Sequence, residues 1–188
     1  MAVDPEELES LVALMDDRDT VVTELVNSRL ASQGPEIVRS LRNRSERETD
    51  PARKALIVER AKALNNEFKL ADFQDFTTRA PGPLSLFEGS WIISSMLDWT
   101  LQRERYEDLF FRCSQAYLAE GSDQRTGVEN IRILNHIFYH RLKFTLYDVQ
   151  LRDPQYALVS DVLKSRGGNP FALAFMYLMI CQIAGLPV

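Results

Sequence analysis

The sequence has few of the side chains on which thiol and metal chemistry depend, with two cysteines and two histidines among 188 residues. Cys113 and Cys181 each lie in an apolar stretch, and neither has a Cys-x-x-Cys or Cys-x-x-His spacing beside it. A disulfide framework and a structural zinc site are therefore not indicated. We expect two free, buried thiols in a cytoplasmic protein, and we expect no metal or other cofactor.

The chain also lacks an excess of positive charge and a hydrophobic run of membrane-spanning length. Charged residues make up 26% of the chain and its net charge is -5, as in an ordinary acidic globular protein. The most apolar stretch, residues 171–188, falls short of the about 20 residues that a bilayer requires. The acidic N-terminal residues do not have the pattern of a secretory signal. We therefore expect no nucleic-acid partner, no membrane span and no secretion signal.

Apolar residues recur at helical spacing along nearly the whole chain, and only residues 144–151 have an extended pattern. Helix caps and breakers divide this pattern into segments. The predicted caps include Asp4 before the first helix and one within the polar run at residues 16–19 before the second. The predicted helices span residues 5–15, residues 21–33, a short segment around Leu41, and residues 52–78, 84–102, 106–120, 127–142 and 170–184. The sequence predicts an all-α fold. In the long helix at 52–78, we expect the inward residues to be Leu56, Ala63, Leu64, Phe68 and Phe73.

The first two helices resemble a HEAT-type helix pair. The pattern Leu-x-x-Leu-Met-Asp-Asp-x-Asp-x-x-Val runs from Leu11 to Val22 and places a capped turn between two apolar stripes. One such pair leaves an apolar face uncovered, so the rest of the chain must pack on it. Ala80-Pro81-Gly82-Pro83 is the best linker candidate. We therefore expect a HEAT-like helical region at residues 1–80 and a second helical domain at residues 81–188.

Basic residues gather between Arg39 and Lys62, where eight basic and four acidic residues occur. Such a patch is typical of a phosphate-binding surface, and it is the basis for an alternative hypothesis of regulatory nucleic-acid binding. The simpler interpretation, which we favour, is a solvated helix face with ion pairs between neighbouring turns.

The C-terminal third resembles the bacterial transglutaminase-like proteins related to the Sir-B-type invasion regulators. The helix at 131–138 contains Leu134-Asn135-x-x-Phe138, which is similar to the Leu-Asn-x-x-Leu/Phe of that family. The segment from Tyr177 to Val188 is similar to its Tyr-Leu…Leu-Gly-Leu-Pro signature. Further residues fall at the family's spacing, namely Phe144, Pro154, Val162-Leu163 and Gly168-Asn169-Pro170. The sequence departs from the family at Lys143, where the family has glycine, and at Leu146-Tyr147, where it has Gly-Asn.

This resemblance implies that the nucleophile position of transglutaminase-like enzymes falls on Pro170. Such enzymes place a cysteine at the first turn of a helix, where the helix dipole and a histidine favour the thiolate. Proline has no nucleophilic atom, although it is favoured as a first helical residue. The resemblance places the partner histidine on strands beyond Val188. We therefore carry over no catalytic residue to this chain.

The resemblance and the helical pattern together predict an all-α helical bundle with a HEAT-like N-terminal helix pair and the helical half of a transglutaminase-like core. The expected function is that of a non-catalytic protein-interaction or regulatory module with a protein partner. The alternative is a hydrolase or acyl transferase of the same superfamily whose catalytic His and Asp lie beyond Val188. The candidate binding residues are Asn169, Pro170, Asn135, Trp91 and Met176.

Two further features have simpler structural explanations. His136 and His140 are four residues apart on one predicted helix, but the zinc-protease motif requires Glu at position 137, where this chain has Ile. Trp91 belongs to an apolar stripe that is more typical of a core than of a ligand site. We expect both histidines to serve helix packing, with no metal bound.

Overall fold

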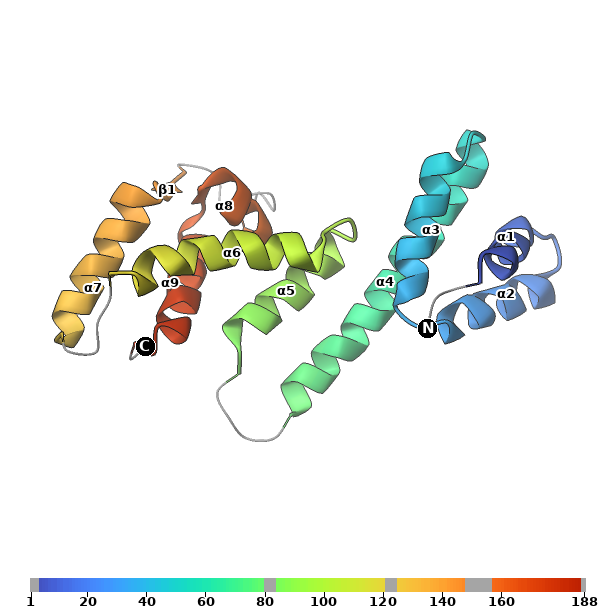
Figure 1. Ribbon diagram of the computed structural model, residues 1–188. Coiled ribbons are helices and arrows are strands. Elements are labelled where there is room, and N and C mark those ends of the chain that lie inside the picture. The colour runs from blue at the N-terminus through green and yellow to red at the C-terminus, as the bar shows by residue number, and fades with distance from the viewer. Residues whose placement is uncertain (1–3, 80–83, 121–124, 148–156, 187–188) are drawn as a thin grey trace. The chain divides into compact units, whose positions relative to one another are not determined.

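The computed structural model describes residues 4–79, 84–120, 125–147 and 157–186. In these ranges the chain forms nine α-helices, one π-helical segment and two short strands (Figure 1). The predicted all-α class is confirmed. The chain divides into two compact units, Met1–Asp75 and Phe76–Val188, and each is described by itself. The predicted linker at residues 80–83 lies outside the described residues.

The first unit holds α1 (Pro5–Ala13), α2 (Thr20–Ser32), α3 (Glu36–Arg47) and most of α4 (Pro51–Thr78). Two of its helices begin at predicted caps. The Asp4 carboxylate accepts a hydrogen bond from Glu6 N at 3.0 Å, and the Asp19 carboxylate accepts one from Val21 N at 2.9 Å. These bonds satisfy backbone donors that the first turn of a helix leaves open.

The inward face of α4 differs from the predicted one. Leu64 is buried as expected, but Ala63 is exposed, and Leu56, Phe68 and Phe73 are only partly buried. The buried row consists of Ile57, Ala61 and Leu64. These three follow an i, i+4, i+7 spacing and define one helix face. Apolar residues occur at adjacent positions along α4. Periodicity alone therefore did not distinguish the predicted inward face from the buried one.

After the end of α4, the described residues of the second unit form six helical segments: α5 (Leu86–Leu97), α6 (Arg103–Leu118), α7 (Gly127–Asn135), the π-helical η1 (His136–Arg141), α8 (Val159–Ser165) and α9 (Pro170–Ile183). The helix predicted at 84–102 ends early because Asp98 turns the chain, accepting a hydrogen bond from Thr100 N at 3.1 Å. The helix predicted at 127–142 changes to a π-helix, in which Leu142 N donates to Ile137 O at 2.8 Å.

A small parallel sheet pairs β1 (Thr145–Leu146) with β2 (Gly167–Gly168). Thr145 N donates to Arg166 O at 2.9 Å, and Tyr147 N donates to Gly168 O at 3.1 Å. The predicted extended segment is confirmed at β1, and its residues 148–151 lie outside the described residues. This pairing fixes the segment that leads into α9.

Helix α9 lies at the centre of the second unit. Figure 1 shows it crossing behind α6, with α7 on one side and α5 on the other. Its buried side chains are Ala172, Leu173, Met176, Met179, Ile180 and Cys181. No helix in the described ranges is both long enough and apolar enough to cross a membrane. The buried side chains of α9 make it a core helix, as predicted.

Candidate functional site

The first turn of α9 is closed by a side-chain cap. Asn169 is 3% exposed, and its Oδ1 accepts a hydrogen bond from Ala172 N at 2.9 Å. Pro170 occupies the first helical position and is exposed. The side chain of Asn169 is therefore occupied in starting the helix, and Pro170 presents only a saturated ring to the outside.

The other candidate binding residues lie in different surroundings. Asn135 is exposed, and its Oδ1 accepts a hydrogen bond from the Tyr177 hydroxyl at 2.9 Å, which ties the end of α7 to α9. Trp91 and Met176 are core residues, at 6% and 0% exposure. The structure thus places Pro170 at the surface beside a buried Asn169, and it places the Trp91 and Met176 side chains where a partner cannot reach them.

A cleft lies beside the first turn of α9, and we call it the α9 cleft. Its volume is about 320 Å³, and hydroxyls enter its lining only from Ser90 and Ser94 among the described residues. The apolar lining comes from Ile93, Ala157, Leu158, Val159, Phe171, Ala172 and Phe175. Phe171 is 75% exposed and Ile93 is 45% exposed. The cleft is therefore an apolar surface open to a ligand.

Phe171 is not among the predicted binding residues, although the sequence pattern indicates that its side chain is exposed. The buried residues of α9 include Ala172, Leu173 and Met176, which occupy one side of the helical wheel. Phe171 precedes this set by one residue and so falls outside it. A large exposed aromatic residue in the first turn of an otherwise buried helix is informative, because apolar surface of this size often marks a contact site.

The hydroxyl groups at the cleft belong to a buried network around Tyr106. The Ser90 and Tyr106 hydroxyls lie 2.7 Å apart, and Tyr106 is fully buried. Burial raises the pKa of Tyr106 to about 12, while hydrogen bonds from Ser90 and Ser94 oppose that shift. The Tyr106 ring also packs against Phe87 and Trp91. Ser90 therefore anchors a core tyrosine, and nothing in this network activates it as a nucleophile.

Both cysteines are free and buried, as predicted. Arg166 Nη1 donates to Cys113 Sγ at 2.7 Å, and the Cys113 thiol lies 3.1 Å from Leu109 O. Burial raises the pKa of Cys113, although the Arg166 charge opposes this, and burial also raises the pKa of Cys181. Each sulfur is thus held as a thiol inside the second unit, which is the opposite of an activated nucleophile.

The two histidines lie together on η1. The His136 and His140 rings have centroids 5.4 Å apart, and both side chains are exposed. No group of three or more His, Cys, Asp or Glu side chains suited to a metal ion occurs within the described ranges. Among the described residues, the π-helical turn therefore carries two neighbouring, tilted imidazoles and no complete metal-ligand set.

The C-terminal part of the chain is similar to a known protein family. Residues 101–188 match the model of a family described as the transglutaminase-like superfamily, and this range runs from the start of α6 through β1, β2 and α9. No curated protein and no solved structure matches the chain. The HEAT-like character of the N-terminal helices and the relation to Sir-B-type proteins stay predictions. Residues 101–188 are similar to the transglutaminase-like superfamily.

Proposed function

We propose that this chain is a non-catalytic transglutaminase-like module that binds a protein partner. The observation that carries the proposal is Pro170, which stands at the first position of α9, where the resemblance places the cysteine nucleophile. Asn169 caps the helix beside it, so the start of the helix has the geometry that such a site requires. The reacting sulfur is absent, and a proline ring is in its place.

Neither cysteine of the chain replaces the missing nucleophile. Cys113 lies in α6, and its sulfur is hydrogen-bonded to Arg166 and to Leu109 O. Cys181 lies in the last turns of α9. Burial raises the pKa of both thiols, so little thiolate is present at neutral pH. Both cysteines belong to the core, and this supports a binding role over an enzymatic one.

The α9 cleft is the surface that we assign to the partner. Its volume of about 320 Å³ lies at the lower end of the about 300–1,000 Å³ typical of ligand pockets. Phe171 and Ile93 expose apolar area at its edges. An apolar side chain of a partner protein would remove this area from water, which is the main favourable term in protein association.

Basic residues in the first unit support a protein partner over a nucleic acid. Arg44 pairs with Glu9 at 2.7 Å and with Glu48 at 3.1 Å, and Arg53 approaches Asp16 at 4.0 Å. A guanidinium group that is already paired with a carboxylate contributes less to phosphate binding.

The proposal includes a HEAT-like N-terminal region and a cytoplasmic location, for which the two free thiols are suited.

The proposal is tested by an assay for hydrolysis or transfer of glutamine side-chain amides, with a cysteine-free variant as the matched control. We would assay the chain and its C113S/C181S double variant for ammonia release from glutamine-containing peptides, with and without an amine acceptor. The proposal predicts no turnover above buffer for either protein. Turnover by the unsubstituted chain would contradict it, and retention of that activity in the double variant would point to a nucleophile other than cysteine. Turnover by a longer natural chain would instead support the alternative with His and Asp beyond Val188.

A further inference from the structure

A second apolar hollow lies in the second unit, between the start of α5, one face of α6 and the end of α9. We call it the Phe111 groove, and its volume is about 620 Å³. Phe87 and Phe110 form its floor with rings 5.0 Å apart, and Phe111 and Ile183 stand at its edges. Phe111 is 58% exposed and Ile183 is 47% exposed. The groove thus combines a packed aromatic floor with exposed apolar edges.

Gln182 holds the walls of the groove together. Its Nε2 donates to Leu84 O at 2.8 Å, and its Oε1 accepts a hydrogen bond from Leu86 N, also at 2.8 Å. This pair of bonds fixes the end of α9 against the beginning of α5. The groove is therefore preformed, and a ligand need not order these elements on binding.

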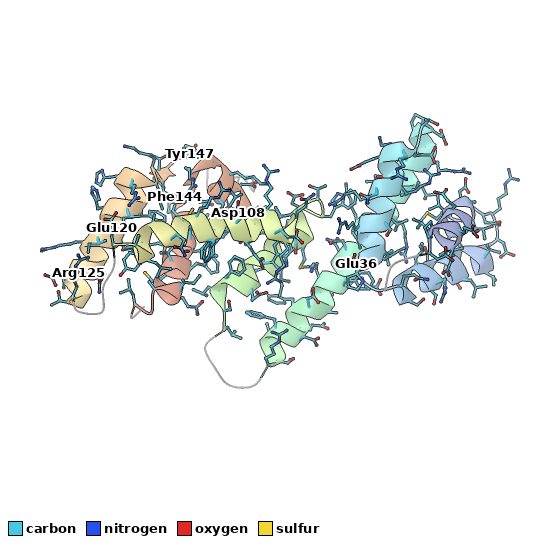
Figure 2. All side chains as sticks on the ribbon, viewed as in Figure 1. Glu36, Asp108, Glu120, Arg125, Phe144 and Tyr147 are labelled. Carbon is cyan, nitrogen blue, oxygen red and sulfur yellow. The ribbon has the colours of Figure 1, made fainter. Side chains whose placement is uncertain are left out.

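One wall of the groove is acidic. Glu104, Glu107 and Asp108 line it from α6, and Phe111 follows on the same helix face at the i, i+3, i+4 and i+7 positions. Asp108 is labelled on α6 in Figure 2. Three carboxylates and one exposed aromatic ring therefore share a single face that looks onto the hollow.

The arginines nearby neutralise only part of this charge. Arg103 is shared between Glu88 and Glu107, and Arg112 pairs with Asp108 at 2.7 Å. Glu104 makes no ion pair with any residue that the structure describes. Of the three carboxylates that line the groove, Glu107 and Asp108 are paired with arginines, and Glu104 keeps its negative charge at the edge of the apolar groove.

We infer that the Phe111 groove binds a basic peptide segment of a partner protein, with an apolar side chain on the Phe87–Phe110 floor and a neighbouring Lys or Arg at Glu104. This inference rests on the proposed function, because it names the chemistry of a partner that such a module takes. Charge complementarity selects this occupant. An acidic segment or a nucleic acid meets like charge at the α6 wall, and a purely apolar ligand leaves Glu104 without a partner.

The two parts of this site have different roles in binding. The aromatic floor supplies affinity, because buried aromatic contacts at the centre of an interface carry most of its binding energy. The unpaired carboxylate of Glu104 attracts and orients a cation, and exposed charges of this kind act mainly on the association rate and its dependence on salt. Binding should therefore weaken with added salt, and loss of either part should be measurable by itself.

The experiment uses the full 188-residue chain and fluorescently labelled synthetic peptides in an anisotropy titration. The probes are short peptides with one Trp or Phe flanked by lysines and arginines. Two control sets replace the basic residues with Glu or the aromatic residue with Ala. The protein variants are Glu104→Lys and Phe111→Ala. Their matched controls are Glu24→Lys, an exposed glutamate on α2, and Leu25→Ala, a leucine on the same helix that is 66% exposed.

The basic aromatic probes are expected to bind, and both control peptide sets are expected to bind at least about tenfold more weakly. Glu104→Lys and Phe111→Ala should each weaken binding about tenfold, with Glu24→Lys and Leu25→Ala within about twofold of the unsubstituted chain. The inference is overturned if no basic aromatic probe binds, or if Glu104→Lys and Phe111→Ala leave the affinity unchanged. Loss of binding in a further variant, Phe171→Ala, and in no other would overturn it while supporting the α9 cleft. Amide turnover by the chain would count against the proposed function itself.

Discussion

The ring of Tyr147 lies directly against the α-carbon of Gly167, so closely that a methyl group on that carbon would overlap with the ring. Tyr147, which is labelled in Figure 2, follows β1. Gly167 begins β2, and Tyr147 N donates to Gly168 O across the same pairing. Gly167 is thus required by a close side-chain approach and not by a left-handed backbone. The small sheet that leads into α9 depends on this contact.

We expect Gly167→Ala to lower the free energy of unfolding by about 1–3 kcal/mol, because the new methyl group forces the Tyr147 ring to move. In the Tyr147→Ala background the same change should cost much less, since the ring is gone. Urea denaturation of the four proteins gives the coupling energy. Gly127→Ala is the matched control, because a methyl group there meets open space. Equal costs of Gly167→Ala in both backgrounds would contradict the predicted clash.

Two non-glycine residues of the second unit have left-handed backbones, Lys143 and Arg166, each with φ of 61°. Lys143 is exposed, so Lys143→Gly should raise the free energy of unfolding by about 0.5–1 kcal/mol through relief of strain. Arg166→Gly relieves the same strain but removes the bond to Cys113 and the contact of the guanidinium with the Phe144 ring, centred 5.1 Å away. It should therefore destabilise the chain. Thermal denaturation of Lys143→Gly and Arg166→Gly tests these two expectations. A stabilising effect of Arg166→Gly would show that the Arg166 contacts contribute little to stability.

Several local features of the fold could be predicted from the sequence. A cap at Asp4 and a second cap within residues 16–19 were predicted because side-chain oxygens there satisfy backbone donors, and the structure places the second cap at Asp19. The resemblance also placed a glycine where Lys143 has its left-handed backbone. The register of α4 and the π-turn at η1 were not predictable, because each depends on which neighbour packs against the helix. The Phe111 groove was also beyond prediction, since the bonds of Gln182 join residues that are far apart in the sequence.

Tyr106 makes the free energy of unfolding depend on pH in the alkaline range. Its pKa is raised from about 10 in the unfolded chain to about 12 in the folded protein. Below pH 10 the phenol is neutral in both states, and its contribution to stability is fully present. Between about pH 10 and 12 only the unfolded chain loses the proton, so the contribution is lost as pH rises, by about 2–3 kcal/mol in total.

Tyr106→Phe should therefore have a weaker decline in unfolding free energy between about pH 10 and 12 than the unsubstituted chain. At neutral pH the same variant should be less stable by about 1 kcal/mol, because it loses the hydrogen bond with Ser90. Urea denaturation across this pH range measures both effects. An identical pH dependence in the two proteins would show that Tyr106 titrates normally.

Asn169 stabilises α9 through its cap. We expect Asn169→Ala to cost about 1–2 kcal/mol of unfolding free energy, and Asn169→Ser to retain most of that stability, because a serine hydroxyl can accept the same hydrogen bond from Ala172 N. Asn43→Ala is the control, since Asn43 is exposed inside α3 and caps no helix. Equal losses for Asn169→Ala and Asn169→Ser would contradict a capping role.

The measurement that tests the central claim most directly is quantitative affinity capture from the native cell with three forms of the chain. These are the unsubstituted chain, Phe171→Asp at the α9 cleft, and Ile131→Asp on an exposed position of α7. Phe171→Asp should fold normally, because a carboxylate in the first turn of α9 is favoured by the helix dipole. The account predicts a stoichiometric protein partner that the unsubstituted chain and Ile131→Asp recover and Phe171→Asp loses. Recovery of the same proteins by all three forms, or of no partner by any, would contradict it.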